Sequence, residues 1–398
     1  MDFGKIPGID SLGDLKGKRV FLRTDFNVPL EGETITSDQR ITAALPTIQL
    51  LLGKGAQVIL ASHLGRPEGV GFEKEFSLKP VAKRLSELLG SEVPLIPDCV
   101  GENTRKSAHG IPDGHAALLE NLRFHKAEKK GSEVFGRELA SYADVYVNDA
   151  FGTCHRGDAS MVWPAKVLPS AAGLLVKAEV EAMARVLDNP ARPCVAVLGG
   201  AKVSDKIPLV NNLLGKVNEI CIGGGMAYTF LLAEGIGIGN SLCEDTLIDE
   251  CKQIMARASD LGAIIHLPSD HVVAGDIEDE QFEEVNGDVP EGKAAFDIGG
   301  NTLTRFADAI KRSRTILFNG PMGVFEKERF SNGTKGVLSA IAAATGGGAY
   351  SVVGGGDSAA AVEHFGLLDK MNHVSTGGGA SLTLLQGGPM PALEALIK

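Results

Sequence analysis

Arginine and histidine side chains lie close to the ends of short apolar runs in the first half of the chain. Arginine carries a planar fork of N–H donors that matches two oxygens of a phosphate or carboxylate. One such arginine is as easily explained by a surface ion pair. Several of them near strand ends indicate a pocket for a small molecule with several negative charges. The residues concerned are Arg23, Asp25, Asn27, Arg40, His63, Arg66, Arg123, His155 and Arg156.

Glycine takes the corresponding places in the second half, where four runs follow apolar segments at 199–200, 223–225, 354–356 and 377–379. Backbone without side chains lets N–H groups approach a ligand, and an adjoining helix start favours a phosphate. Lys202 and Lys206 lie one helical turn apart after the first run, where their charges could follow a phosphoryl group. A tight turn between strand and helix also requires glycine, so each run alone leaves that structural explanation open.

The glycine runs do not match the two best-known nucleotide-binding sequences. The chain has no G-x-x-x-x-G-K-[ST] segment. Gly354 to Ala359 fits the looser G-x-G-x-x-A pattern, but Thr376 and glycines stand about 20 residues later, where an acid would bind ribose. A nicotinamide-dependent oxidoreductase is therefore disfavoured. An anion pocket in one half and a nucleotide site in the other indicate phosphoryl transfer, which depends on positioning and charge stabilisation.

The elements that would position these residues alternate between helix and strand. Apolar residues at helical spacing predict helices within 40–55, 77–90, 176–193 and 244–262. Short β-branched runs predict strands at 19–25, 57–63, 144–149, 195–199, 219–223, 263–267, 315–319, 350–354 and 373–376. This alternation predicts an α/β fold with two Rossmann-like lobes, each a mainly parallel sheet with helices on both faces. Ligands of such sheets bind beyond the carboxyl ends of the strands.

Length and composition limit the class of protein. A chain of 398 residues suggests two domains, and a net charge of −11 disfavours a nucleic-acid or anionic-membrane partner. The six cysteines form no C-x-x-C pair and the nine histidines no H-x₃-H pair, so neither a disulfide framework nor a zinc site is predicted. The start lacks an apolar signal segment, and glycines interrupt the uncharged stretch 336–356. We therefore expect a cytoplasmic chain that does not cross a membrane.

Several segments resemble the phosphoglycerate kinase family. The first is RVFLRTDFNVPL at 19–30, which is similar to the N-terminal signature of that family. The others follow in the order of the family: SHLGRP, LLENLRFH, VNDAFGTCHR, GGAKVSDKI, GGGMAYTF, FNGPMGVFE, GGGDSAA and STGGGASL. The resemblance covers nearly the whole chain. It implies reversible, Mg²⁺-dependent phosphoryl transfer between 1,3-bisphosphoglycerate and ADP, which gives 3-phosphoglycerate and ATP.

The resemblance also implies how the chain is organised. We expect an N-terminal 3-phosphoglycerate-binding domain at 1–170, a C-terminal nucleotide-binding domain at 171–380, and a segment 381–398 that packs back on the first domain. The two lobes would be joined by a hinge, and in-line transfer would follow hinge closure in a monomer. Another ATP-dependent kinase of small carboxylates remains an alternative. A non-catalytic nucleotide-binding protein would have degraded strand-end residues, and these are intact.

Site residues follow from the matching motifs. The resemblance implies that the acid is bound by Asp25, Asn27, Arg40, His63, Arg66, Arg123 and Arg156. It implies that the nucleotide contacts Gly200, Lys202, Lys206, Gly223, Gly224, Gly225, Asn319, Glu326, Gly355, Gly356, Asp357 and Ser358, with Mg²⁺ held by Asp357 and ribose by Glu326. Charge on the transferred group would be stabilised by Arg40, Lys202, Gly356 and Gly379. Two departures stand out: Asp158 replaces a histidine common in the family, and Ala295 replaces a glycine that often contacts adenine.

Overall fold

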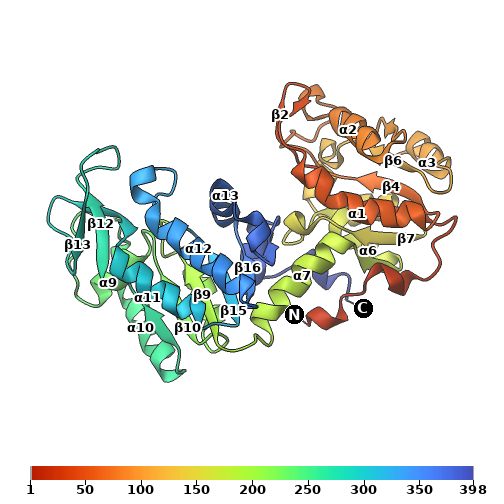
Figure 1. Cartoon of the computed structure of the whole chain (residues 1–398). Helices are drawn as coiled ribbons and strands as arrows, with labels where there is room; N and C mark the ends of the chain where they lie inside the picture. Colours follow the sequence, from red (N-terminus) through yellow and green to blue (C-terminus); the bar gives the residue numbers. More distant parts are fainter. Residues whose placement is uncertain (1, 398) are drawn as a thin grey trace. The chain divides into compact units, whose positions relative to one another are not determined.

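A computed structural model describes residues 2–397, which form two compact units (Figure 1). The first unit extends to Glu181 and includes the C-terminal segment from Pro389. The second unit is Ala182–Gly388. The divisions thus fall after residues 181 and 388, whereas the sequence placed them after 170 and 380.

The first unit is built on a six-stranded parallel sheet with the order β5-β6-β4-β1-β7-β8. Apolar runs such as Val20 to Leu22 suit strands that are buried on both faces. Because β8 pairs with β7, this unit continues beyond residue 170. A separate hairpin of β2 (Leu30–Glu31) and β3 (Thr34–Ile35) stands outside the sheet. The sheet strands are β1 (Arg19–Arg23), β4 (Gln57–Ala61), β5 (Leu95–Ile96), β6 (Ala116–Leu119), β7 (Val145–Asn148) and β8 (Ser170–Ala172).

Helices cover both faces of this sheet. They are α1 (Gln39–Gly53), α2 (Lys79–Leu89), α3 (Glu102–His109), α4 (Lys126–Lys129), α5 (Glu133–Ala140), α6 (Ala159–Val167) and, from the C-terminal segment, α15 (Pro391–Glu394). Alternate side chains of a strand point to opposite faces. Val20 and Leu22 share a core with residues of α1 and α2, whereas Phe21 stacks on Tyr146 with ring centroids 6.1 Å apart. On that side α6 packs on β7 and β8, and α15 packs on α6.

The second unit repeats this plan with a six-stranded parallel sheet in the order β11-β10-β9-β15-β16-β17. One face is closed by a core that joins Val195, Ile316 and Phe318 to side chains of α11, α12 and α13. Leu317 points to the opposite face and is also fully buried. The strands are β9 (Cys194–Leu198), β10 (Glu219–Ile222), β11 (Ile264–His266), β15 (Thr315–Asn319), β16 (Tyr350–Val353) and β17 (His373–Val374). The helices are α7 (Leu174–Leu187), which contains the division at 181, α8 (Ile207–Leu213), α9 (Ala227–Ala233), α10 (Ile248–Asp260), α11 (Gly300–Lys311), α12 (Asn332–Gly346), α13 (Gly356–His364) and α14 (Gly379–Leu385).

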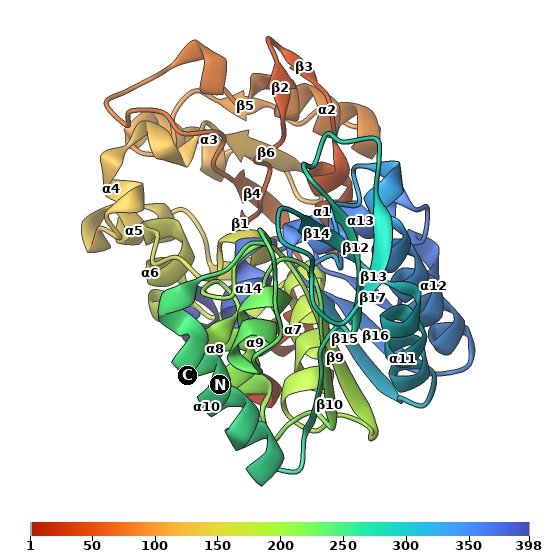
Figure 2. The ribbon, with the colours of Figure 1, turned by 90° about the vertical axis from the view of Figure 1, so that its left-hand side faces the viewer.

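A small antiparallel sheet with the order β13-β12-β14 is added to the second unit (Figure 2). Its strands are β12 (Asp270–Ala274), β13 (Glu283–Asn286) and β14 (Ala294–Ile298). No pattern in the sequence predicts this sheet. Acidic residues and glycines interrupt this part of the chain, so no clear alternation of apolar and polar residues marks the strands.

The predicted fold class is confirmed, since each unit has a parallel sheet covered by helices. All nine predicted strands are present, and their ends differ from the predicted ones by no more than two residues. The uncharged stretch 336–356 forms most of α12, a turn and β16, as expected. Within residues 2–397, no helix combines the length and the apolar character that crossing a membrane requires.

Candidate functional site

Most of the predicted acid-binding residues lie at one edge of the first sheet. Parallel neighbours end at the same edge, and β6, β4, β1 and β7 are consecutive in the sheet. The segments that follow these strands, together with the first turn of α1, carry Asp25, Asn27, Arg40, His63, Arg66, Arg123 and Arg156.

Hydrogen bonds connect these segments. Arg40 Nη1 donates to Asp25 Oδ2 at 2.8 Å. The Gly65 N–H donates to Asn27 Oδ1 at 2.8 Å, and Arg123 Nη1 donates to the Gly65 carbonyl at 2.8 Å. The segments after β1, β4 and β6 are therefore fixed to one another through Gly65.

Burial and charge set the protonation of Asp25 and His63. Burial alone would raise the pKa of Asp25, but nearby positive charges, among them Arg40 and Arg23, outweigh it and the pKa is lowered. Burial holds the pKa of His63 well below its usual value, and nearby arginines add to that effect despite Asp25. At neutral pH the site therefore contains an ionised Asp25, a neutral imidazole and charged arginines.

Arg23 is not available to a ligand, because its side chain is fully buried. Its Nε donates to Ser160 Oγ at 2.9 Å, and its Nη2 lies 3.3 Å from His63 Nδ1. Glu128 Oε1 lies 3.9 Å from the same guanidinium. Since a guanidinium only donates, His63 Nδ1 accepts and its proton is on Nε2. The expectation that Arg23 belongs to the anion pocket is thus wrong, and Arg23 positions His63 instead.

Asp158, which is not among the predicted site residues, lies beside Arg123. Asp158 Oδ2 is 3.8 Å from Arg123 Nη2, and the two side chains are 8% and 6% exposed. Neither Asp158 Oδ2 nor Arg123 Nε has a hydrogen-bond partner among the described residues. Burial lowers the pKa of Arg123, and Asp158 opposes this shift. The carboxylate thus offsets part of the positive charge at this edge.

Arg66 and Arg156 are exposed. Arg156 Nε lies 3.4 Å from His155 Nε2. Both guanidiniums are therefore accessible from solvent at the same edge as the more buried Arg123.

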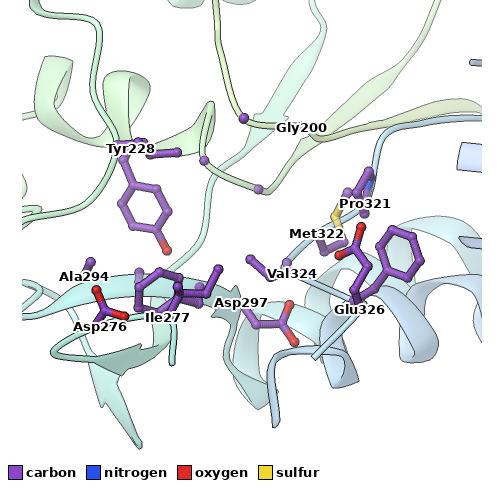
Figure 3. Close-up of a pocket in the computed structure, with 18 of the residues that line it drawn as sticks. Gly200, Tyr228, Asp276, Ile277, Ala294, Asp297, Pro321, Met322, Val324 and Glu326 are labelled. Carbon is purple, nitrogen blue, oxygen red and sulfur yellow. The ribbon is translucent and has the colours of Figure 1, made fainter. Parts of the chain in front are cut away.

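The second unit contains a cavity of about 660 Å³ beside the turns that follow β9, β10 and β15 (Figure 3). Five predicted nucleotide-binding residues line it: Gly200, Gly224, Gly225, Glu326 and Asp357. The other seven predicted residues are not part of its lining: Lys202, Lys206, Gly223, Asn319, Gly355, Gly356 and Ser358.

Some of these glycines are required by close backbone packing. Gly224 has φ +66°, and a Cβ there would lie 2.7 Å from Gly200 N. A Cβ on Gly223 would lie 2.5 Å from Met322 Sδ. The Gly224 N–H donates to the Met322 carbonyl at 3.0 Å. The glycines therefore allow the turns after β9, β10 and β15 to come into contact. Close packing thus explains the glycines at these positions in addition to the predicted binding of phosphate.

Lys206, Asn319 and Ser358 do not line the cavity and make hydrogen bonds at the ends of β15 and β16. Lys206 Nζ donates to Asn319 Oδ1, and Asn319 Nδ2 donates to the Gly354 carbonyl at 2.6 Å. Ser358 Oγ accepts from the Gly320 N–H at 2.7 Å. These contacts join the carboxyl ends of β15 and β16 to the start of α8.

Lys202 and Lys206 differ in their surroundings. Lys202 is exposed, whereas Lys206 is partly buried. Burial lowers the pKa of Lys206 to about 8, against the opposing effect of Asp357 and Asp205. A phosphate placed near Lys206 would stabilise its charged form.

Asp297 and Tyr228 also line the cavity, outside the set that the sequence predicts. Asp297 is 2% exposed, accepts the N–H groups of Gly333 and Ile298 at 2.7 and 2.9 Å, and has a pKa raised by burial to about 7. The Tyr228 hydroxyl lies 3.0 Å from His271 Nδ1. An acid within the apolar run of β14 was the one signal for Asp297, whereas Tyr228 stands in the GGGMAYTF segment, to which only the glycines had been assigned a role.

Ala295 also lines the cavity, and its N–H donates to Ser241 Oγ at 3.0 Å. In the family, a glycine at this position often contacts adenine. The small side chain of Ala295 borders the cavity at the same position.

Each unit is an α/β unit with a parallel sheet. The first has arginines at the carboxyl ends of its strands, and the second has a glycine-lined cavity. These are the features of a kinase that acts on a small anion. The family model for phosphoglycerate kinase matches residues 9–388. The chain belongs to the phosphoglycerate kinase family. Its members are phosphotransferases with a carboxyl group as acceptor.

Individual relatives agree with this assignment. The chain is 51% identical over 392 residues to a phosphoglycerate kinase of Anaeromyxobacter dehalogenans strain 2CP-C, which covers 97% of this chain and 98% of that protein. It is 48% identical over 387 residues to the cytosolic phosphoglycerate kinase of Triticum aestivum, with 96% of each covered. The phosphoglycerate kinase structure from Coxiella burnetii matches with a TM-score of 0.93 and 44% identity over 98% of each chain. That from Pyrococcus horikoshii OT3 matches with 0.80 and 33% over 98% of each chain.

Proposed function

We propose that the chain catalyses reversible phosphoryl transfer between 1,3-bisphosphoglycerate and ADP, with the acid bound by the first unit and the nucleotide by the second. The observation that carries this proposal is the arginine-rich edge of one sheet together with the glycine-lined cavity beside the other, in a member of this family.

The acid would be held by the edge residues of the first sheet. Arginine forks suit its phosphate and carboxyl oxygens, and the Nε2–H of neutral His63 supplies a donor without a further charge. Asp25 would hold Arg40 in place through their 2.8 Å contact and accept a substrate hydroxyl. The proposed residues are Asp25, Asn27, Arg40, His63, Arg66, Arg123 and Arg156.

The nucleotide would occupy the cavity of the second unit, with Glu326 at the ribose and the backbone of the glycine turns at the phosphates. Lys202 and Lys206 would add positive charge. Asp357 fits a magnesium ligand, because it is an exposed carboxylate that lines the cavity in the first turn of α13. When bound with the nucleotide, Mg²⁺ neutralises phosphate charge. The remaining proposed contacts are Gly200, Gly223, Gly224, Gly225, Asn319, Gly355, Gly356 and Ser358.

The chemistry requires no general base. The acceptor in the direction of ATP use is a carboxylate, which is ionised at neutral pH because carboxyl pKa values lie near about 4. Arg40, Lys202 and the N–H groups of Gly356 and Gly379 would stabilise charge on the transferred group. In-line transfer would follow closure at a hinge that brings the two bound substrates together.

A coupled assay of ATP formation tests the proposal. We expect ATP from ADP and 1,3-bisphosphoglycerate with Mg²⁺, and none from ADP and acetyl phosphate. Arg40→Ala should lower kcat by about 10²-fold or more, since one well-placed donor contributes about 3–4 kcal/mol in such a transition state. Arg137→Ala is the matched control, because Arg137 pairs with Glu133 at 2.7 Å within α5, outside the proposed site. Activity with acetyl phosphate alone, or Arg40→Ala within threefold of wild type, would contradict the proposal.

We further propose that the chain acts as a cytoplasmic monomer on these small molecules. The net charge of −11 supports the absence of nucleic-acid and anionic-membrane partners. Light scattering coupled to gel filtration tests the monomer, for which the sequence mass is 41.7 kDa.

A further inference from the structure

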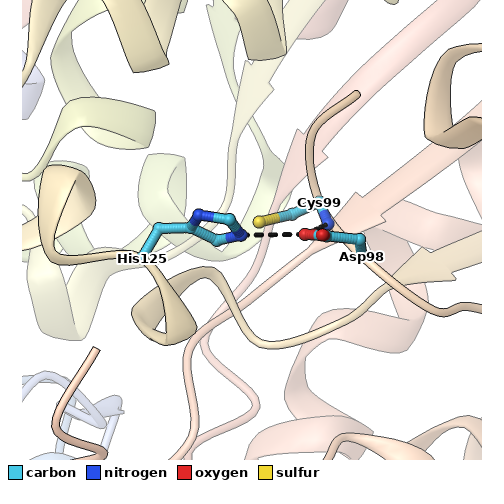
Figure 4. A group of neighbouring side chains, drawn as sticks. All are labelled: Asp98, Cys99 and His125. Carbon is cyan, nitrogen blue, oxygen red and sulfur yellow. Dashed lines mark hydrogen bonds and ion pairs between the residues drawn. The ribbon is translucent and has the colours of Figure 1, made fainter. Parts of the chain in front are cut away.

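Three side chains with different donor atoms, none of them among the residues proposed to bind the acid, meet in the first unit (Figure 4). Asp98 and Cys99 lie in the segment between β5 and α3, and His125 lies between the turn that ends at Phe124 and α4. The three potential ligand atoms lie within 4.8 Å of one another. The sequence predicted no such group, because the spacing matches no familiar zinc motif.

The sheet order explains this meeting. β5 and β6 are parallel neighbours, with Ile96 opposite Leu119. The segments that follow these strands therefore leave the sheet at the same edge. One delivers a carboxylate and a thiol on adjacent residues, and the other delivers the imidazole.

The spacing of the ligand atoms allows a tetrahedral metal centre after small movements of the side chains. His125 Nε2 lies 2.8 Å from Asp98 Oδ1. Ligand atoms at about 2.0–2.3 Å from a tetrahedral Zn²⁺ lie roughly 3.3–3.7 Å from each other. Insertion of the ion would therefore replace the Asp98–His125 hydrogen bond. The distance between these two ligand atoms would increase by less than about 1 Å.

Access and charge also suit a cation. The side chains of Asp98 and His125 are 54% and 31% exposed, whereas Cys99 is 1% exposed and closes the inner side. The ion would enter from solvent beside the exposed Asp98 carboxylate, and Cys99 would be its inner ligand.

We propose that Asp98, Cys99 and His125 form a Zn²⁺ site with three protein ligands and a water molecule in the fourth position. The mixture of thiolate, imidazole and carboxylate selects a borderline-soft ion over Mg²⁺, which prefers oxygen ligands. Binding releases one proton to solvent: the Cys99 S–H bond breaks as the Zn–S bond forms, with no change of oxidation state. The ion would tie the segment after β5 to the one that carries Arg123 and His125.

Metal titration of the full chain tests the site, without nucleotide or substrate. We expect one Zn²⁺ per chain by competition with a chromogenic chelator. Co²⁺ should give a thiolate-to-metal charge-transfer band with the strong visible absorption of four-coordinate cobalt. Cys99→Ser and His125→Gln should each weaken Zn²⁺ binding by about tenfold or more and remove or shift the Co²⁺ spectrum.

Cys243→Ser is the control for adventitious thiol binding, because Cys243 is a partly exposed cysteine outside the cluster; it should keep the full signal. His125→Gln changes a partly exposed side chain, so it tests the site even if Cys99→Ser fails to fold. The proposal is overturned if wild type binds no Zn²⁺ in the micromolar range, or if His125→Gln binds Zn²⁺ and Co²⁺ like wild type.

Discussion

Asp158 gives the sharpest test of the electrostatics at the edge of the first sheet. Its carboxylate lies 3.8 Å from Arg123 and is 8% exposed. It makes no side-chain cap at the start of α6, so Asp158→Asn removes one negative charge with no loss of a helix cap. If the acid's phosphate binds at Arg123, Asp158 repels it, and the substitution should lower the KM for 3-phosphoglycerate.

The magnitude follows from the distances. With Arg123 between them, the carboxylate and the phosphate would be about 7 Å apart, and a phosphate monoester carries about −1.5 to −2 charges at pH 7. Coulomb repulsion is then about 1 kcal/mol in water and about 2 kcal/mol at half that dielectric constant. The KM for 3-phosphoglycerate should therefore fall by roughly 5- to 30-fold.

Steady-state kinetics in the ATP-consuming direction measures this, with the KM for ATP as internal reference. Asp144→Asn is the matched control, because Asp144 pairs with Arg19 at 2.8 Å at the opposite end of β1. That variant should leave both KM values within about twofold. An unchanged or higher KM for 3-phosphoglycerate in Asp158→Asn would refute the placement of the phosphate beside Arg123.

Three further predictions concern the second unit. Because the pKa of Lys206 is lowered to about 8, kcat/KM for ADP should fall above pH 8, while Lys206→Gln should show a lower value without that fall. The Asp297 carboxyl has a pKa of about 7 in the folded chain and 3.8 in the unfolded chain. Between these two pH values the folded chain therefore keeps a proton that the unfolded chain releases. Its contribution to stability thus declines from pH 4 to 7, and the Tm of Asp297→Asn should rise relative to wild type over that range; a constant difference would contradict this. Gly224→Ala introduces a Cβ 2.7 Å from Gly200 N at φ +66° and should lower Tm by about 4–10 °C, whereas Gly346→Ala, with open space around its Cβ, should change Tm by under about 2 °C.

The predicted strands were found where β-branched residues are concentrated, and two of the missed strands, β6 and β8, lack them. β6 reads AALL and β8 reads SAA, and alanine does not distinguish a buried strand from a helix. Their place in the sheet is set by pairing with β4, β5 and β7, which is a tertiary effect. The antiparallel β12–β14 sheet was missed because its strands do not alternate clearly.

Local motifs predicted the loops of the site better than the role of each residue. Arg23 stands in the same motif as Asp25, but its position at the end of a buried strand turns it inward towards Ser160 and His63. Asp297 joins the cavity through the unpredicted β14. The Asp98, Cys99 and His125 group depends on β5 lying next to β6. Such contacts between distant segments depend on the order of the strands in the sheet. The spacing of residues along the chain does not predict that order.

Calorimetry on two variants tests directly whether the two substrates are held by separate units. Arg66→Ala alters an exposed arginine of the first sheet's edge, and Glu326→Ala alters a carboxylate that lines the cavity of the second unit. Arg66→Ala should weaken binding of 3-phosphoglycerate about tenfold or more and leave that of Mg-ADP within about twofold; Glu326→Ala should do the reverse. Equal weakening of both ligands by either variant, or the opposite assignment, would contradict the account.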